Sequence, residues 1–317
     1  MLAAGGPELS DLLARTEARL AEVATGHGPE LAGHAAGTLS AGGKRLRPML
    51  VFLCASGDAD GRLVAAAAAV ELLHMATLVH DDVLDRAPLR RGRPTVFATG
   101  GRLAATATGD LLFSRAFAEL ASTGSRDAVR ALSTASSALA SGELMQRADA
   151  WSDHVTPERY LERCRLKTAS LFEASCRLGA LFGGRPELAE PVGRFGERVG
   201  LAFQILDDVL DVSGSTERTG KPRGTDLLDG TVTLPLILAR ERDAGLRELD
   251  LRTSVTEPAE AAGVCDRIAL TGALDEARAR ALKHVSDAKA ALEGVDLQPE
   301  RRRALGLVAD GVVERYA

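Results

Sequence analysis

One acidic pentad, Asp-Asp-Val-Leu-Asp, occurs twice in the chain, at residues 81–85 and 207–211. Each copy follows a long apolar stretch, where carboxylates are costly unless a cation or a hydrogen-bond donor compensates them. Residues four apart lie on one face of a helix, so the first and last aspartates of each pentad form a carboxylate edge. A solvated acidic face would explain a single pentad. The repetition instead favours two helices whose carboxylate edges face one cavity.

Carboxylate edges of this kind attract a hard divalent cation. Neighbouring carboxylates repel one another and raise each other's pKa unless a cation lies between them. Mg²⁺ prefers carboxylates, water and substrate phosphates as ligands. The predicted Mg²⁺ ligands are the six aspartates of the two pentads: Asp81, Asp82, Asp85, Asp207, Asp208 and Asp211.

Basic side chains are grouped in short motifs around the pentads. Gly-Gly-Lys-Arg-Leu-Arg-Pro occupies residues 42–48, before the first pentad, and Arg-Arg-Gly-Arg-Pro-Thr occupies residues 90–95, after it. Two further lysines are Lys167, which Thr-Ala follows, and Lys221, which lies between Gly and Pro. Arginine binds phosphate oxygens through two parallel hydrogen bonds, and lysine adds a point charge. These cations predict a site for a ligand that carries a diphosphate.

Composition excludes some classes of protein and of partner. The 317 residues are 45% hydrophobic and carry a formal net charge of −5. No segment forms a basic stripe without interleaved acids, which argues against a nucleic-acid partner. The four cysteines show no Cys-x-x-Cys spacing, so reduced, buried thiols and a cytoplasmic location are expected.

Hydrophobic periodicity predicts an all-α chain. Apolar residues recur at helical spacing in residues 9–23 and 161–176, and strand-like alternation is scarce. The most apolar stretch, residues 63–79, contains Glu71 and His74 and is shorter than a bilayer requires, so a buried helix is expected and no transmembrane segment. No break is long or biased enough for a linker, which predicts a single domain over residues 1–317.

The order and spacing of these motifs resemble the trans (E-type) isoprenyl diphosphate synthases, or polyprenyl synthetases, over residues 42–235. The resemblance also rests on Phe203-Gln204 before the second pentad and on Gly-Lys-Pro-Arg-Gly-Thr-Asp-Leu at residues 220–227. It implies a single helical bundle of the isoprenoid synthase type around a central cavity. It also implies a Mg²⁺-dependent prenyltransferase, a homodimer, that condenses isopentenyl diphosphate with an allylic diphosphate.

The resemblance assigns roles to individual residues. Arg90, Lys167 and Lys221 would bind the allylic diphosphate. Thr168 and Gln204 would lie near the allylic cation, where oxygen dipoles stabilise positive charge. The residues implied for isopentenyl diphosphate are Lys44, Arg47, His74 and Arg91. His74 and Gln204 have a simpler alternative, as hydrogen-bonded residues of a helical core.

Two positions bear on substrate affinity and product length. Thr231 stands where many relatives have a lysine, which removes one cation near the allylic diphosphate. Leu73, Ala76 and Thr77, which precede the first pentad, lack aromatic bulk, so the product tunnel is expected to be open and the product to be hexaprenyl or longer. A geranylgeranyl product is the alternative, if Phe113 closes the tunnel lower down.

Two rival functions share part of this pattern. A class I terpene cyclase also ionises an allylic diphosphate, but its second metal motif typically mixes Asn, Ser or Thr with Glu. A non-catalytic subunit of a heteromeric synthase would be expected to have lost carboxylates or cations. Both pentads are intact here, which disfavours both rivals.

Overall fold

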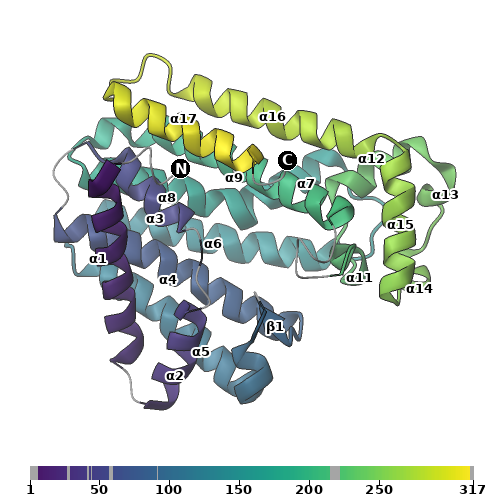
Figure 1. Ribbon diagram of the computed structural model, residues 1–317, viewed down its shortest axis with the longest axis horizontal. Helices are drawn as coiled ribbons and strands as arrows, with labels where there is room; N and C mark the ends of the chain where they lie inside the picture. Colours follow the sequence, from purple (N-terminus) through teal and green to yellow (C-terminus); the bar gives the residue numbers. More distant parts are fainter. Residues whose placement is uncertain are drawn as a thin grey trace. The chain divides into compact units, whose positions relative to one another are not determined.

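The computed structural model describes residues 6–26, 29–40, 43, 45–56, 60–90, 92–214 and 222–314 (Figure 1). These residues are almost entirely helical, which confirms the predicted all-α class. The described strands are β1 Leu89–Arg90 and β2 Arg93–Pro94, which pair antiparallel as one short hairpin.

The chain divides into two compact units, each assembled from separate stretches of sequence. Unit 1 comprises residues 1–136, 171–196 and 292–307, and unit 2 comprises residues 137–170, 197–291 and 308–317. Three helices contribute several residues to each of the two units: α6 Arg126–Ala148, α9 Ala189–Ser213 and α17 Pro299–Glu314.

Unit 1 contains the first pentad. Its helices are α1 Gly6–Thr25, α2 Pro29–Ser40, α3 Leu46–Cys54, α4 Gly61–Leu84, α5 Val96–Ala121 and most of α8 Ser170–Phe182, with a 3₁₀ turn at Pro186–Leu188. The predicted periodicity of residues 9–23 is confirmed in α1, where Leu9, Leu12, Leu20 and Val23 are buried. Helix α4 packs along α5 over most of its length.

Helix α4 carries the first pentad at its C-terminal end. The Asp60 side chain caps its N-terminus by accepting hydrogen bonds from the main-chain N–H groups of Arg62 and Leu63, at 2.9 and 3.1 Å. The helix ends at Leu84, and Asp85 forms its C-cap. With 24 residues it is longer than the predicted stretch, and by length and composition alone it could cross a membrane. The predicted length of the apolar helix was therefore too short. The predicted burial is confirmed, because 78% of the most apolar window of α4 is buried within the protein.

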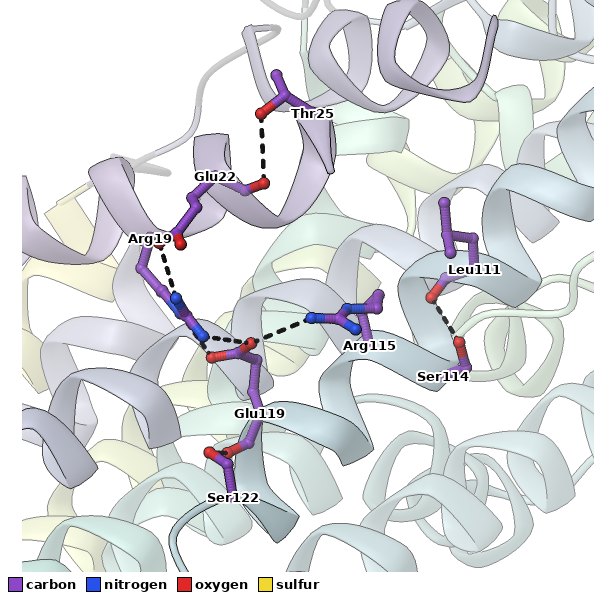
Figure 2. A network of polar contacts seen from close by, with 8 residues as sticks. All are labelled: Arg19, Glu22, Thr25, Leu111, Ser114, Arg115, Glu119 and Ser122. Carbon is purple, nitrogen blue, oxygen red and sulfur yellow. Dashed lines mark hydrogen bonds and ion pairs between the residues drawn. The ribbon is translucent and has the colours of Figure 1, made fainter. Parts of the chain in front are cut away.

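A buried glutamate on α5 holds the N-terminal helix in place (Figure 2). Arg19 on α1 donates two hydrogen bonds to the carboxylate of Glu119, from Nε at 2.8 Å and from Nη2 at 3.0 Å. Arg115, one turn earlier on α5, adds a longer ion pair to the same carboxylate at 3.7 Å. This paired geometry compensates the burial of the Glu119 charge and fixes α1 against α5.

Unit 2 contains the second pentad, on α9. Its other described helices are α7 Pro157–Cys164, α11 Thr225–Leu228, α12 Leu234–Arg242, α13 Ala244–Arg247, α14 Leu251–Ser254, α15 Pro258–Leu270 and α16 Ala273–Ala291. Between α7 and α8 the chain forms a π-helical turn, Arg165–Ala169, which the apolar periodicity did not predict. Helix α6 passes very close to this turn at Gly142, where an added Cβ would lie 2.5 Å from the main-chain nitrogen of Lys167.

All four cysteines lie in the part of the chain that the structure describes. Each of them is buried and free, which confirms the expectation of reduced thiols. Burial is the main cause that raises the pKa of the Cys164 thiol to about 12. The Cys164 thiol therefore stays protonated at neutral pH and packs as a small apolar group.

Candidate active site

The first pentad separates into accessible and buried carboxylates. Asp85 is exposed and Asp81 is half-buried, and both lie at the C-terminal end of α4. Asp82 is only 4% exposed. Its Oδ1 accepts a hydrogen bond from Nε of Arg90 on β1, at 2.7 Å. Asp82 therefore forms a buried ion pair with a predicted substrate-binding arginine, whereas Asp81 and Asp85 remain accessible to solvent.

The second pentad shows the same division on α9. Asp207 is exposed, and Asp211 is half-buried. The Asp211 carboxylate accepts hydrogen bonds from the main-chain N–H groups of Thr225 and Asp226, at 3.1 and 3.2 Å. These two N–H groups begin helix α11, so Asp211 anchors this short helix to α9.

Asp208 is the buried carboxylate of the second pentad, and its hydrogen-bond partners are uncharged. The hydroxyl of Tyr160 on α7 donates to its Oδ2 at 2.6 Å, and Nε2 of Gln204 donates to its Oδ1 at 2.8 Å. Burial is the main cause that raises the pKa of Asp208 to about 7, and the two hydrogen bonds oppose that rise. Tyr160 itself is fully buried, and burial followed by the charge of Asp208 raises its pKa well above the usual range.

Thr168 and Gln204, both assigned to the allylic cation, are in direct contact. Oγ1 of Thr168 donates to Oε1 of Gln204 at 2.7 Å, across 36 residues of sequence. Thr168 belongs to the π-helical turn, and Gln204 lies one helical turn before Asp208 on α9. The structure therefore brings these two predicted residues together with the second pentad.

The third predicted residue of this region, Lys167, is paired with an acid that the sequence did not suggest. Its Nζ lies 2.5 Å from Oε2 of Glu143 on α6 and donates to Oε1 of Gln146 at 3.3 Å. Burial is the largest single influence and raises the pKa of Glu143, but the charges and hydrogen bonds of Lys167 and Arg147 together outweigh it, so the pKa is lowered. Glu143 therefore holds the Lys167 ammonium in place as an ionised partner.

A cavity of about 330 Å³ lies beside the first pentad in unit 1. His74 and Asp82 from α4 line it together with Arg90 and Arg93 from the hairpin, and Thr38 from α2 lies on its wall. Imidazole and guanidinium groups suit the oxygens of a diphosphate. The predicted residues His74 and Arg90 therefore line the same cavity, although they lie on either side of the first pentad in the sequence.

Arg45 occupies an unusual backbone position at the edge of the same cavity. Its φ of 45° and ψ of 40° are left-handed, a conformation that costs an arginine free energy. Its side chain pairs with Glu17 on α1 and with Oε1 of Glu71 on α4, the latter at 2.6 Å. Glu71 is buried, so this ion pair compensates both its charge and the backbone strain.

The remaining predicted cations are only partly described. The guanidinium of Arg47 lies over the ring of Phe172, 4.6 Å from its centroid, in a cation–π contact. Lys44, Arg91 and Lys221 lie outside the described residues.

The residues predicted to control product length occupy different environments on α4. Leu73 and Ala76 are fully buried, and Thr77 is half-buried, with its hydroxyl donating to the carbonyl of His74 at 2.7 Å. Phe113, which was the alternative candidate for closing the product tunnel, lies on α5 with 38% of its surface exposed. The centroid of its ring lies 5.2 Å from that of Phe117.

The family model described as polyprenyl synthetase matches residues 29–268. The chain belongs to this family. A polyprenyl synthetase is a trans-prenyltransferase, and the predicted enzyme class and isoprenoid synthase fold are thereby confirmed.

Named relatives cover nearly the whole of this polyprenyl synthetase. A heptaprenyl diphosphate synthase component 2 from Geobacillus stearothermophilus is 40% identical over 95% of this chain and 94% of its own. An all-trans-nonaprenyl-diphosphate synthase (geranyl-diphosphate specific) from Rhodobacter capsulatus is 37% identical over 85% of this chain and 84% of its own. A solved polyprenyl synthase from Caulobacter crescentus, complexed with calcium and isoprenyl diphosphate, has a TM-score of 0.93 and 34% identity, and the match covers 100% of this chain and 98% of that one.

The site of this polyprenyl synthetase includes three residues that sequence reasoning missed: Tyr160, Glu143 and Asp226. Each contacts a predicted residue from a distant part of the sequence or from a neighbouring loop, so no local motif marked it. The carboxyl group of Asp226 is buried, and burial followed by the charge of Asp211 raises its pKa well above the usual range. A signal for Asp226 did exist, because it lies within the motif at residues 220–227.

The carboxylates suit Mg²⁺ only together with further ligands. Among the residues that the structure describes, no three His, Cys, Asp or Glu side chains are grouped closely enough to hold a metal ion by themselves. Mg²⁺ is usually held by one or two carboxylates and completes its octahedral shell with water and substrate phosphates. The accessible carboxylates of the two pentads are therefore the donor set that fits this ion.

Proposed function

We propose that this polyprenyl synthetase condenses isopentenyl diphosphate with an allylic diphosphate to give an all-trans polyprenyl diphosphate of medium to long chain. Relatives that bear heptaprenyl and nonaprenyl names at 40% and 37% identity support this product class. The observation that carries the substrate class is the cavity beside the first pentad, where His74 and Arg90 lie together. The guanidinium of Arg90 and the imidazole of His74 can donate hydrogen bonds to the oxygens of a diphosphate.

Mg²⁺ is the proposed cofactor, held by Asp81, Asp85 and Asp207. Asp85 and Asp207 are exposed and Asp81 is half-buried, so all three carboxylates are accessible to a cation. When bound, Mg²⁺ neutralises the negative charge that builds on the departing diphosphate. The solved polyprenyl synthase from Caulobacter crescentus, complexed with calcium and isoprenyl diphosphate, supports a divalent cation as a companion of this kind of ligand.

The side chains of the protein bind and orient the two substrates. Arg90, Lys167 and Lys221 take the allylic diphosphate, and the isopentenyl diphosphate goes to Lys44, Arg47, His74 and Arg91. The carbon–oxygen bond of the allylic substrate breaks, and its electron pair leaves with pyrophosphate. The terminal carbon of isopentenyl diphosphate then attacks the allylic cation, and pyrophosphate accepts the proton that is lost. Oxygen dipoles of Thr168 and Gln204 stabilise the cation.

The test is to incubate the purified chain alone with Mg²⁺, isopentenyl diphosphate and each of the geranyl, farnesyl and geranylgeranyl primers. Product length is read by mass spectrometry, and excess chelator serves as the control. Products of six or more prenyl units that disappear with chelator are expected. No condensation with any primer would contradict the reaction, and a product that stops at farnesyl would contradict the chain length.

The active form is proposed to be a homodimer in which α5 contributes to the interface. Leu103 is 84% exposed on this helix and Phe113 is partly exposed, so a second copy of the chain could bury these two apolar side chains. Light scattering should give twice the mass of the chain, and Leu103→Glu should lower it. A monomer that is active only with a second, different chain would instead favour a heteromeric enzyme, as the name of the relative heptaprenyl diphosphate synthase component 2 suggests for that protein.

A single domain over residues 1–317 and a cytoplasmic location complete the proposal. Three helices that contribute to both units support one cooperative domain, and four free, buried cysteines support a reducing compartment. One cooperative thermal transition would agree with a single domain, and two separate transitions would contradict it. Fractionation of cells should recover the chain in the cytoplasm.

A further inference from the structure

Four side chains of unit 2 form a continuous line of hydrogen bonds. Thr168 donates to Gln204 at 2.7 Å, Gln204 donates to Asp208 at 2.8 Å, and Tyr160 donates to the second oxygen of Asp208 at 2.6 Å. Asp208 is 4% exposed, and Tyr160 is fully buried. Of the four residues, Tyr160 has no part in the proposed chemistry, and Asp208 was expected only as a metal ligand.

The donors and acceptors along this line fix its direction. Nε2 of Gln204 donates to Oδ1 of Asp208, so the face of Gln204 toward Asp208 is its NH₂ group. The amide oxygen of Gln204 then points to Thr168, and the Thr168 hydroxyl must give its proton to that oxygen. Both lone pairs of the Thr168 oxygen consequently lie away from its own hydrogen, where they can meet positive charge. Tyr160 occupies Oδ2 and leaves Oδ1 as the acceptor for Gln204.

The two ends of the line are held by rigid surroundings. The guanidinium of Arg163 lies 5.4 Å from the centroid of the Tyr160 ring and donates to the carbonyl of Val232 at 2.6 Å. At the other end, Thr168 belongs to the π-helical turn against which α6 packs at Gly142. Rotation of any one group would break a buried hydrogen bond, so the arrangement is held as a unit.

We infer that Tyr160 and Asp208 are positioning residues, which orient the Gln204 amide and, through it, the Thr168 hydroxyl for the allylic cation. This inference rests on the proposed function. It gives Asp208 a role through hydrogen bonds, in place of the direct contact with Mg²⁺ that its pentad suggests. Asp207, its exposed neighbour, keeps the metal.

A double-mutant cycle between Tyr160→Phe and Gln204→Leu tests the inference. Tyr160→Phe keeps the ring and removes only the hydroxyl. In the wild-type background it should lower kcat by about tenfold and leave KM for both diphosphates within about twofold, as expected for one hydrogen bond to a charged group. In the Gln204→Leu background the same change should lower kcat by less than about twofold, because the residue through which Tyr160 acts is gone.

Ser175→Ala is the matched control. Ser175 is fully buried and donates to the carbonyl of Leu171 at 2.6 Å, so this variant also loses a buried hydroxyl, but outside the line of hydrogen bonds. Its kcat should stay within about twofold of wild type. A loss of kcat from Tyr160→Phe that is equal in both backgrounds, or no loss at all, would overturn the inference.

Two further measurements cover other outcomes. If Tyr160→Phe does not fold, Asp208→Asn replaces it in the same cycle, and an equal loss of kcat with and without Gln204 again overturns the inference. If the wild-type chain turns over no primer, the proposed function fails by itself. The cycle is then measured as free energies of unfolding, where additive effects of Tyr160→Phe and Gln204→Leu would show that the two side chains are not coupled.

Discussion

The two pentads have the same five residues, yet their buried aspartates are compensated differently. Asp82 pairs with the guanidinium of Arg90, whereas Asp208 accepts hydrogen bonds from the neutral groups of Tyr160 and Gln204. A positive partner favours the carboxylate, and neutral partners in a buried site leave its pKa raised to about 7. The repeat therefore marks where carboxylates are needed, but their neighbours decide what each one does.

The last aspartates of the pentads differ as well. Asp85 ends helix α4 and is exposed, whereas Asp211 lies inside α9 and accepts the first N–H groups of α11. The first pentad thus ends in an accessible carboxylate. The last carboxylate of the second pentad instead holds the first turn of α11.

The largest effect is expected at the accessible aspartates. Asp81→Ala and Asp207→Ala should each lower turnover by at least about a hundredfold, because several kcal/mol of metal-derived charge stabilisation is lost. Their melting temperatures should stay close to that of wild type, since neither side chain is buried. Turnover is measured over a Mg²⁺ titration. Near wild-type turnover of either variant would refute its place among the ligands.

The next effect separates the two buried aspartates by stability. Asp82→Asn leaves Arg90 without its buried carboxylate and should cost about 2 kcal/mol in the free energy of unfolding, less than for a fully buried pair because Arg90 is partly exposed. Asp208→Asn loses one of two accepted hydrogen bonds, but it also removes a buried charge that no described cation pairs directly, so it should change that free energy by no more than about 1 kcal/mol. Denaturant unfolding of both variants measures the difference. Equal losses would show that the partner does not matter.

Product length tests whether the turn before each pentad also differs. Ala76 lies five residues before Asp81, and Ala202 lies five residues before Asp207; both are fully buried. Ala76→Phe should shorten the product by at least one prenyl unit, at a cost of about 1–3 kcal/mol for the added bulk. Ala202→Phe is the control, which carries the same bulk but should leave product length unchanged. If Ala76→Phe and wild type made the same product, the prediction that the product tunnel is open at Ala76 would be refuted.

The smallest effect is expected from restoring the missing cation near the second pentad. Thr231 is half-buried, and its main-chain N–H donates to the carbonyl of Asp226 at 2.7 Å, so the side chain can be changed without loss of that bond. Thr231→Lys should lower KM for the allylic substrate by a contact worth at most about 1.5–3 kcal/mol. Thr231→Met, which has length but no charge, is the control. A KM that stays the same or rises would mean that another cation already fills the place.

Local patterns predicted the helices and the pentads well. The periodicity of residues 9–23 identifies α1, and the apolar stretch before each pentad identifies α4 and α9, because both signals depend on neighbours within one or two turns. The partners of the buried aspartates could not be predicted in this way. Tyr160 lies 48 residues before Asp208, and only packing brings the two together.

The π-helical turn was missed for a related reason. Residues 161–176 keep an apolar rhythm that an ordinary helix satisfies, and Cys164, Leu171 and Cys176 are indeed buried. The turn lies close to α6 at Gly142, a contact between segments that are distant in sequence. Sequence periodicity describes a face of a helix, and it does not report a local change in helical pitch.

Arg45 has a consequence for how this enzyme can change by mutation. Glycine would relieve the left-handed backbone at this position, but it would also remove the guanidinium that compensates the buried Glu71. Lysine would keep the charge and lose the fork that reaches Glu17 and Glu71 at once. No single substitution improves both properties, so a more stable version of this loop has to be reached through paired changes at residues 45 and 71.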